Sequence, residues 1–244
     1  MIEYLIDFLV QDFRVAVLSR GYKRRTTGFR EVLLESTVAE VGDEPLQFKR
    51  NFPKVTIAVC ADRREGIEKI QNEADIILLD DAFQHRSVRA SINILLTPFN
   101  DLYSNDLVVP AGNLREFRSG AKRADIIVVT KCPEGVAYST LQNIQLKIKL
   151  GDHQKLYFSK IGYDTFIYGP SEKLPLSYLR DKKFTLVTGI AKPKPLVDFL
   201  KEKKFIFNHK KYPDHYDFSP TDIARLEKNE ILLTTQKDYM RLQP

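Results

Sequence analysis

Apolar residues along this chain gather in short runs of strand length, separated by stretches with helical spacing. Seven such runs occur: Val15–Ser19, Val55–Val59, Ile76–Leu79, Ile92–Leu96, Ile126–Thr130, Phe184–Gly189 and Ile231–Thr235. Most lack polar alternation, which is typical of parallel strands covered on both faces. Helical stretches separate several of them: Arg64–Glu73, Tyr138–Leu150, Pro195–Lys203 and Pro220–Glu227. This alternation predicts a doubly wound α/β fold with a mostly parallel sheet.

The two ends of the chain and one internal stretch indicate how the fold is divided. Met1–Val10 has the apolar spacing of an amphipathic helix, but the strand and turn that usually lead into such a helix do not precede it. Ile231–Thr235 predicts a strand nine residues before the last residue, so we expect a truncated C-terminus. Between residues 150 and 183 the helical and strand periodicity weakens. We therefore expect a core over residues 1–150 and a smaller C-terminal lobe, or a continuation of the fold, over 151–244.

Composition narrows the class of protein without naming a function. Hydrophobic residues make up 43% of the 244 and charged residues 29%, which excludes a disordered chain. The net charge of +6 favours acidic partners, but no aromatic-interleaved basic motif accompanies it, so no nucleic-acid partner is expected. No apolar run is long enough to span a bilayer. Cys60 and Cys132 lack metal-ligand spacing and are expected to be reduced, buried thiols.

The run Ile76–Leu79 ends in two carboxylates, Asp80 and Asp81. Ligands of open α/β sheets bind beyond the carboxyl ends of the strands, where an Asp can hold Mg²⁺ in the manner of a Walker B acid. Adjacent carboxylates in an apolar setting repel each other unless a cation neutralises them. The alternative is that the pair caps the next turn, and from this run alone the two interpretations are equal.

The residues that follow favour a functional site. Gln84, His85 and Arg86 place an amide, an imidazole and a guanidinium directly after the acidic pair, on a segment expected to line the crevice. A lone histidine is more often structural than catalytic. A whole cluster of such groups at a strand end is harder to explain structurally.

Two further segments carry candidate chemistry. Asp43 lies on a loop bounded by Gly42 and Pro45, where a general base could reach a substrate hydroxyl, although an ordinary turn explains the same pattern. His215 lies on a loop before a helix whose start is marked by Ser219 and a proline; a capping or surface histidine is the alternative.

Six short motifs occur here in one order: Ser19-Arg20-Gly21-Tyr22, Gly42-Asp43-Glu44-Pro45, Asp80-Asp81-Ala82-Phe83-Gln84-His85, Pro110-Ala111-Gly112-Asn113-Leu114-Arg115-Glu116, Pro213-Asp214-His215 and Thr234-Thr235-Gln236-Lys237-Asp238. Each motif is short, but the ordered series covers nearly the whole chain. It resembles the tetraacyldisaccharide 4′-kinases, the lipid A kinases of Gram-negative bacteria.

This resemblance implies a P-loop-NTPase-like kinase. Its reaction would be an ATP- and Mg²⁺-dependent transfer of the γ-phosphoryl group to the 4′-hydroxyl of an acylated glucosamine disaccharide 1-phosphate. The product would be lipid IVA, and the protein would be peripheral at the cytoplasmic face of the bacterial inner membrane.

The resemblance also implies roles for individual residues. Asp43 matches the family's catalytic acidic residue with His215 as its partner, a pairing suited to moving a proton off a hydroxyl. The Walker B positions correspond to Asp80 and Asp81, without indicating which of them contacts Mg²⁺ directly. The remaining candidates lie near nucleotide, metal or acceptor, and the arginines among them suit phosphate or head-group contacts: Gln84, His85, Arg20, Arg86 and Arg115.

The chain departs from the family in one respect. Members carry a glycine-rich Walker A loop before an amphipathic helix, whereas no G-x-x-x-x-G-K-[ST] occurs in these 244 residues. The backbone amides and the lysine that hold the phosphates would then be missing, so we expect a fragment with little or no kinase activity alone.

Two rival functions stay open at this point. One is a P-loop relative that modifies another small substrate; Thr130-Lys131-Cys132-Pro133 weakly resembles a GTPase base-reading loop but lacks its Asp. The other is a non-catalytic lipid- or partner-binding protein derived from a P-loop kinase.

Overall fold

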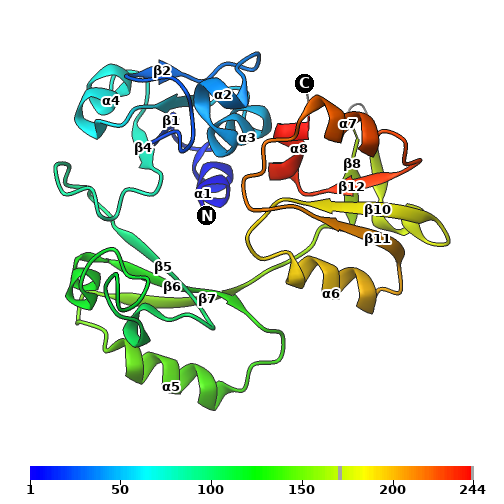
Figure 1. The fold of residues 1–244 in the computed structure, drawn as a ribbon. Helices are drawn as coiled ribbons and strands as arrows, with labels where there is room; N and C mark the ends of the chain where they lie inside the picture. The colour runs from blue at the N-terminus through cyan, green and yellow to red at the C-terminus, as the bar shows by residue number, and fades with distance from the viewer. Residues whose placement is uncertain (170–171, 243–244) are drawn as a thin grey trace. The chain divides into compact units, whose positions relative to one another are not determined.

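The computed structural model describes residues 1–169 and 172–242 and has a mixed α/β fold with mostly parallel sheets (Figure 1). The chain forms two compact units: residues 1–80 together with 164–244 make unit 1, and residues 81–163 make unit 2. The expected mixed α/β class with mostly parallel strands is confirmed. Each unit is described separately below.

The first sheet of unit 1 is built around a fully buried strand. Its order is β2-β3-β1-β4, with β1 parallel to β3 and β4 and with β2 antiparallel to β3. The strands are β1 Val15–Ser19, β2 Arg30–Glu31, β3 Thr56–Val59 and β4 Ile76–Leu79. All five residues of β1 are buried, as its unbroken apolar run predicts, whereas β4 at the edge is half-buried throughout.

Four helices accompany this sheet: α1 Ile2–Leu9, α2 Val38–Val41, α3 Asp43–Asn51 and α4 Arg63–Ile70. The helix predicted at Met1–Val10 is confirmed as α1. The segment Gly42–Pro45, expected to be a loop, instead forms the start of α3. Pro45 is compatible with a first helical turn, because the amide hydrogen that proline lacks has no partner there.

The second sheet of unit 1 is wholly parallel, with β10 Lys183–Thr188 between its neighbours β11 Ile206–Lys211 and β12 Leu232–Thr234. Its helices are α6 Lys194–Glu202, α7 Pro220–Leu226 and α8 Gln236–Leu242, and β8 Phe166–Tyr168 pairs antiparallel with β9 Lys173–Pro175. Before β10 comes a 3₁₀ turn, Leu176–Leu179. The predicted start of α7 is confirmed, since the Ser219 hydroxyl accepts the Asp222 amide hydrogen.

Helix α8 follows the second sheet but packs into the core of the first. Met240 of α8 is 4% exposed and belongs to the same apolar cluster as Ile6, Leu46 and Phe48. On the surface, Asn51 of α3 donates to Gln236 of α8 over 3.2 Å. This packing brings α8 against α3, the helix that begins at Asp43.

Unit 2 is one parallel sheet of three strands with a single helix. Its order is β5-β6-β7, and the elements are β5 Ile94–Pro98, β6 Ile126–Cys132, β7 Lys155–Lys160 and α5 Tyr138–Ile148, with 3₁₀ turns at Tyr103–Asn105 and Arg118–Arg123. Ile127 and Val129 of β6 are fully buried against Ile144 and Ile148 of α5. The predicted strands and helix in this region are confirmed with shifts of one or two residues at their ends.

The two units do not follow the division near residue 150 drawn from the sequence. Residues 164–244 are compact together with residues 1–80, because α8 and the loop carrying His215 contact α3. The assignment of a kinase core to 1–150 stays a prediction.

Cys60 is buried and Cys132 half-buried, both as free thiols, and burial raises the pKa of each. Across the described ranges, every helix is too short or too polar to cross a bilayer.

Candidate active site

Asp43 occupies the first position of α3, where its carboxylate faces the helix N-terminus. Its N-cap, Gly42, has φ +92°, and a Cβ there would lie 3.1 Å from the Tyr22 carbonyl oxygen, so a side chain at this position is strained and crowded. Asp43 is 5% exposed, and its Oδ1 accepts the Glu44 amide hydrogen over 3.0 Å.

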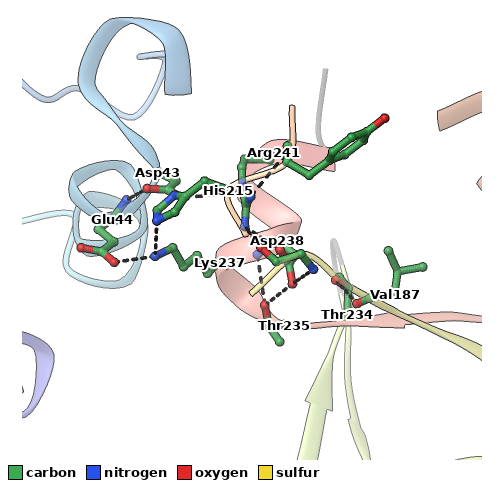
Figure 2. A network of polar contacts seen from close by, with 11 residues as sticks. Asp43, Glu44, Val187, His215, Thr234, Thr235, Lys237, Asp238 and Arg241 are labelled. Carbon is green, nitrogen blue, oxygen red and sulfur yellow. Dashed lines mark hydrogen bonds and ion pairs between the residues drawn. The ribbon is translucent and has the colours of Figure 1, made fainter. Parts of the chain in front are cut away.

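His215 comes from the loop between β11 and α7, with a left-handed backbone of φ +53°. Its own amide donates to the Gly189 carbonyl over 3.0 Å, which fixes the loop against the end of β10. The imidazole Nδ1 lies 2.9 Å from Asp43 Oδ2 (Figure 2). The Tyr22 ring meets the imidazole edge-on, with the ring centroids 5.5 Å apart. Two residues 172 positions apart therefore form one pair inside unit 1, as the resemblance implied.

Helix α8 supplies two cations to this pair. Lys237 Nζ lies 3.4 Å from His215 Nε2 and donates to Glu44 Oε1 over 2.6 Å. Arg241 Nε lies 3.6 Å from Asp43 Oδ2. We call Asp43, Glu44, His215, Lys237, Asp238 and Arg241 the His215 cluster; Figure 2 shows α3, α8 and the His215 loop converging on it.

Asp238 is fully buried and anchors the His215 cluster through its hydrogen bonds. It accepts hydrogens from the Gly189 amide at 3.0 Å, the Thr235 hydroxyl at 2.8 Å and Arg241 Nη2 at 2.5 Å. Arg241 Nη2 also donates to the Gly189 carbonyl over 3.1 Å, the same oxygen that accepts the His215 amide hydrogen. The ion pair therefore holds the backbone on which His215 depends.

Sequence reasoning quoted the Thr234–Asp238 motif without giving its side chains a role, and it missed Arg241 altogether. Lys237 and Asp238 lie three and four residues after the end of strand β12, so they are also polar residues near the carboxyl end of a strand, as Asp80 is directly after β4. That placement was the available signal. Their convergence on Asp43 depends on tertiary packing of α8 against α3, which no local spacing encodes.

Asp80 lies in the turn directly after β4, also in unit 1. Ser19, the last residue of the adjacent parallel strand β1, donates its hydroxyl to Asp80 Oδ2 over 3.0 Å. Arg63 Nη2 donates to the Asp80 carbonyl over 3.1 Å. The carboxylate thus stands at the carboxyl edge of the sheet, where ligands of such sheets bind. Arg20, next along from Ser19, is exposed at the same edge.

Asp81 begins unit 2 in a left-handed conformation, φ +45°, which aspartate tolerates better than most residues. Its Oδ2 receives Arg115 Nη1 over 3.2 Å, with both side chains about 70% exposed, so water screens this pair.

The neighbouring candidates also lie in unit 2. Gln84 and Arg115 line one small hollow. His85 Nε2 contacts the Ser87 hydroxyl at 2.8 Å, and Arg86 pairs with Glu116 at 3.0 Å.

The structure therefore groups the predicted residues in three places: Asp43 with His215, Asp80 with Ser19, and Asp81 with Arg115. Within the described part of the chain, no three His, Cys, Asp or Glu side chains gather as a metal site. Mg²⁺ in nucleotide sites needs only one or two carboxylates, with waters and phosphate oxygens completing its shell. The carboxylate oxygens of half-buried Asp80 and exposed Asp81 fit that hard-cation chemistry.

Comparison with known proteins assigns the chain to a family. The family described as tetraacyldisaccharide-1-P 4′-kinase (LpxK) matches residues 1–244. The tetraacyldisaccharide 4′-kinase of Flavobacterium johnsoniae is 44% identical, covering 99% of this chain and 72% of that protein, and that of Parabacteroides distasonis is 41% identical, covering 99% and 70%. The crystal structure of LpxK from Aquifex aeolicus, described as an "apo" form in complex with ATP, superposes with a TM-score of 0.75 at 30% identity, covering 99% and 74%. The chain belongs to the tetraacyldisaccharide 4′-kinase family, the lipid A kinases.

Proposed function

We propose that this protein transfers the γ-phosphoryl group of ATP to the 4′-hydroxyl of a tetraacyl glucosamine disaccharide 1-phosphate, with Asp43 as the general base. The observation that carries the proposal is the 2.9 Å contact between Asp43 Oδ2 and His215 Nδ1. A carboxylate held in this way is a poised proton acceptor, and the family's named reaction requires a hydroxyl to lose its proton.

The two oxygens of Asp43 have different surroundings. Oδ2 faces His215 and Arg241, whereas Oδ1 accepts the Glu44 amide hydrogen and keeps a second lone pair. Oδ1 is therefore the oxygen that takes the 4′-hydroxyl proton. The 4′-oxygen then bonds to the γ-phosphorus as the bond from that phosphorus to the β–γ bridging oxygen breaks, and ADP leaves with the electron pair.

His215 acts by holding the carboxylate. An Nδ1–H that donates to Oδ2 fixes the orientation of the Asp43 carboxylate before the reaction. Because the histidine contacts Oδ2 only, Oδ1 stays available to the acceptor hydroxyl.

Asp80 and Asp81 are the residues we propose to hold Mg²⁺. The ion, when bound, neutralises the charge that develops on the β- and γ-phosphate oxygens. Ser19 contributes by fixing Asp80 Oδ2 through its hydroxyl, so that the carboxylate is oriented before any ion arrives.

The acceptor is negatively charged and acylated, and both properties match features of the chain. The net charge of +6 and the exposed guanidinium of Arg115 suit a phosphorylated head group, and we propose the same for Arg20, His85 and Arg86. A substrate with four acyl chains resides in a membrane. We therefore propose peripheral action at the cytoplasmic face of the inner membrane.

Phosphate binding is the part of the reaction that these 244 residues do not provide for, since no Walker A motif occurs among them. We propose that on their own they transfer phosphate slowly or not at all. A chimera that places a family Walker A segment before Met1 restores the backbone amides and the lysine.

The test uses that chimera with ATP, Mg²⁺ and the tetraacyldisaccharide 1-phosphate. We expect a product phosphorylated at the 4′ position, identified by ³¹P NMR and mass spectrometry. Asp43→Asn keeps the size of the side chain and one of its two acceptor oxygens but removes its basicity. It should lower kcat about 10²- to 10⁴-fold while the Kd for ATP changes less than about twofold.

Turnover by Asp43→Asn close to that of the unaltered chimera would remove Asp43 from the base role. A chimera that binds ATP and the disaccharide but never transfers phosphate would instead favour a non-catalytic binding protein.

A further inference from the structure

Lys237 closes a ring of polar contacts around the proposed base. Asp43 Oδ2 meets His215 Nδ1 at 2.9 Å, His215 Nε2 meets Lys237 Nζ at 3.4 Å, and Lys237 Nζ meets Glu44 Oε1 at 2.6 Å. Glu44 is covalently next to Asp43 on α3, so the ring returns to its start (Figure 2). Both ring nitrogens of His215 therefore have a charged neighbour, Asp43 at Nδ1 and Lys237 at Nε2.

The chemistry of the ammonium decides which imidazole nitrogen carries hydrogen. A lysine ammonium has three donors and no acceptor, so His215 Nε2 can only meet it with a lone pair. Asp43 Oδ2, in turn, can only accept, so Nδ1 carries the hydrogen. An Nε2–H would point at the positive charge of Lys237 across 3.4 Å.

Charges on both helices define the balance around His215. The titratable groups facing it are Asp43 and Glu44 from α3, Lys237 and Arg241 from α8, and Tyr22 after β1. Lys237 is neutralised by Glu44 at 2.6 Å, and Arg241 is neutralised by Asp238 at 2.5 Å. Arg241 also lies 3.6 Å from Asp43 Oδ2, so with a neutral imidazole the carboxylates of Asp43, Glu44 and Asp238 share two cations and the cluster keeps one net negative charge.

We propose that Lys237 is a positioning residue: it keeps Nε2 of His215 free of hydrogen, so that His215 donates to Asp43 as a neutral imidazole and the carboxylate keeps its basicity. Glu44 supports this role, because its negative charge offsets that of the Lys237 ammonium, which would otherwise lower the basicity of the Asp43 carboxylate. The consequence for turnover rests on the proposed function of Asp43, whereas the state of His215 does not.

The competing explanation is that Lys237 is a solvated surface lysine. Its side chain is only 23% exposed, and the packing of Met240 from the same helix fixes where α8 presents it. A mobile surface lysine would not be held between a carboxylate and an imidazole nitrogen of two other segments.

The first experiment records ¹⁵N chemical shifts of the His215 imidazole in the 244-residue protein at neutral pH, assigned with His215→Gln. An unprotonated ring nitrogen has a chemical shift far from that of a protonated one, so the spectrum reports the protonation state of each nitrogen directly. We expect Nδ1 to be protonated and Nε2 to be unprotonated. A hydrogen on Nε2 in the unaltered protein would overturn the proposal without any variant.

Three variants then separate the role of Lys237 from a general loss of lysine. Lys237→Met removes the charge and should let Nε2 gain hydrogen; Lys237→Arg keeps donors on that side and should preserve the bare nitrogen. Lys228→Met, at an exposed lysine before β12, is the matched control and should leave the spectrum unchanged. If Lys237→Met fails to fold, Lys237→Leu removes the same charge, and unchanged His215 shifts in the folded variant would overturn the proposal.

The final readout is turnover in the Walker A chimera. We expect Lys237→Met to lower kcat at least about tenfold with KM for ATP within about twofold, and Lys237→Arg to retain most of the rate. A bare Nε2 in Lys237→Met together with a full rate would contradict the positioning role. If Asp43→Asn also turned over normally, the fault would lie with the base assignment, and the ¹⁵N result would still stand.

Discussion

Glu116 in unit 2 shows how one carboxylate is held in its charged form. Burial of the side chain raises its pKa, but hydrogen bonds from Arg123 and Arg86 outweigh the burial and lower the pKa overall. Arg123 Nη2 lies 2.7 Å from Glu116 Oε1, and the same guanidinium donates to the Phe83 carbonyl over 3.1 Å. Glu116 thus ties the segment after Asp81 to the turn before β6.

The pH dependence follows from the direction of this shift. Because the folded-state pKa of Glu116 lies below its unfolded value, the stabilisation is complete above the unfolded pKa and disappears as the pH falls through the folded one. We expect Glu116→Gln to lower the free energy of unfolding by about 1–2 kcal/mol at pH 7. The difference should shrink as the pH falls through the folded-state pKa of Glu116, measured by urea unfolding at a series of pH values.

A constant difference from pH 7 to pH 3 would show that Glu116 stabilises unit 2 by packing alone. Glu134→Gln is the matched control in the same unit, since its side chain is 82% exposed; it should show little pH-dependent difference.

Individual site residues were predictable from sequence where a local pattern marks them. An apolar run followed by acids identified Asp80, and the structure places it at the carboxyl end of β4 beside Ser19. The partnership of Asp43 with His215 was different, because no spacing links residues 172 positions apart. It came from the resemblance alone, and Asp43 itself was expected on a loop because the proline after it suggested a turn rather than a helix start.

At the scale of elements, α8 is the part on which the candidate site depends most. It spans only Gln236–Leu242, yet it contributes Lys237 and Arg241 to the His215 cluster and Met240 to the core of the first sheet. Its stability rests on Asp238, which is fully buried and paired with an arginine that is 5% exposed.

We expect Asp238→Asn to destabilise unit 1 strongly. Removing one partner of a buried ion pair leaves the other charge uncompensated, which costs about 3–5 kcal/mol. Calorimetric or urea unfolding should show this loss, and the His215 ¹⁵N signals should broaden or shift because the Gly189 anchor is lost.

Asp198→Asn is the control for that prediction. Asp198 pairs with Lys194 on the exposed face of α6, also within unit 1, where the lysine is 83% exposed. Such surface pairs contribute less than about 0.5 kcal/mol. Equal losses in the two variants would contradict the anchoring role of Asp238.

Elements with strong periodicity were predictable, and weakly patterned ones were not. Strands β1 and β4 match their predicted bounds, since an unbroken apolar run of four or five residues is of strand length and too short for a typical helix. Strands β7 and β11 were missed because their lysines and alternating exposure resemble a polar loop. Helix α8 was missed because its seven mostly polar residues have no apolar stripe; contacts with α3, with Gly189 and with the apolar cluster around Ile6 stabilise it.

At the scale of the whole chain, the sequence order conceals the real grouping. Residues 1–80 and 164–244 form one unit, with 81–163 inserted between them as another. A boundary near residue 150 follows from a local loss of periodicity, which reports the end of α5 and not the long-range contacts that define a unit. The class of fold was predictable from alternation, whereas the grouping required the contacts of α3 with α8.

The central claim is that Asp43 and His215, supplied by distant parts of unit 1, act as one base. A double-mutant cycle in the Walker A chimera tests it most directly, with Asp43→Asn, His215→Gln and the double variant compared by kcat at saturating ATP. If the pair is one unit, Asp43→Asn alone should lose nearly as much rate as the double variant, about 10²- to 10⁴-fold, so that adding His215→Gln to it changes little. Losses that multiply, with the double variant falling by the product of the two single effects, would contradict the account.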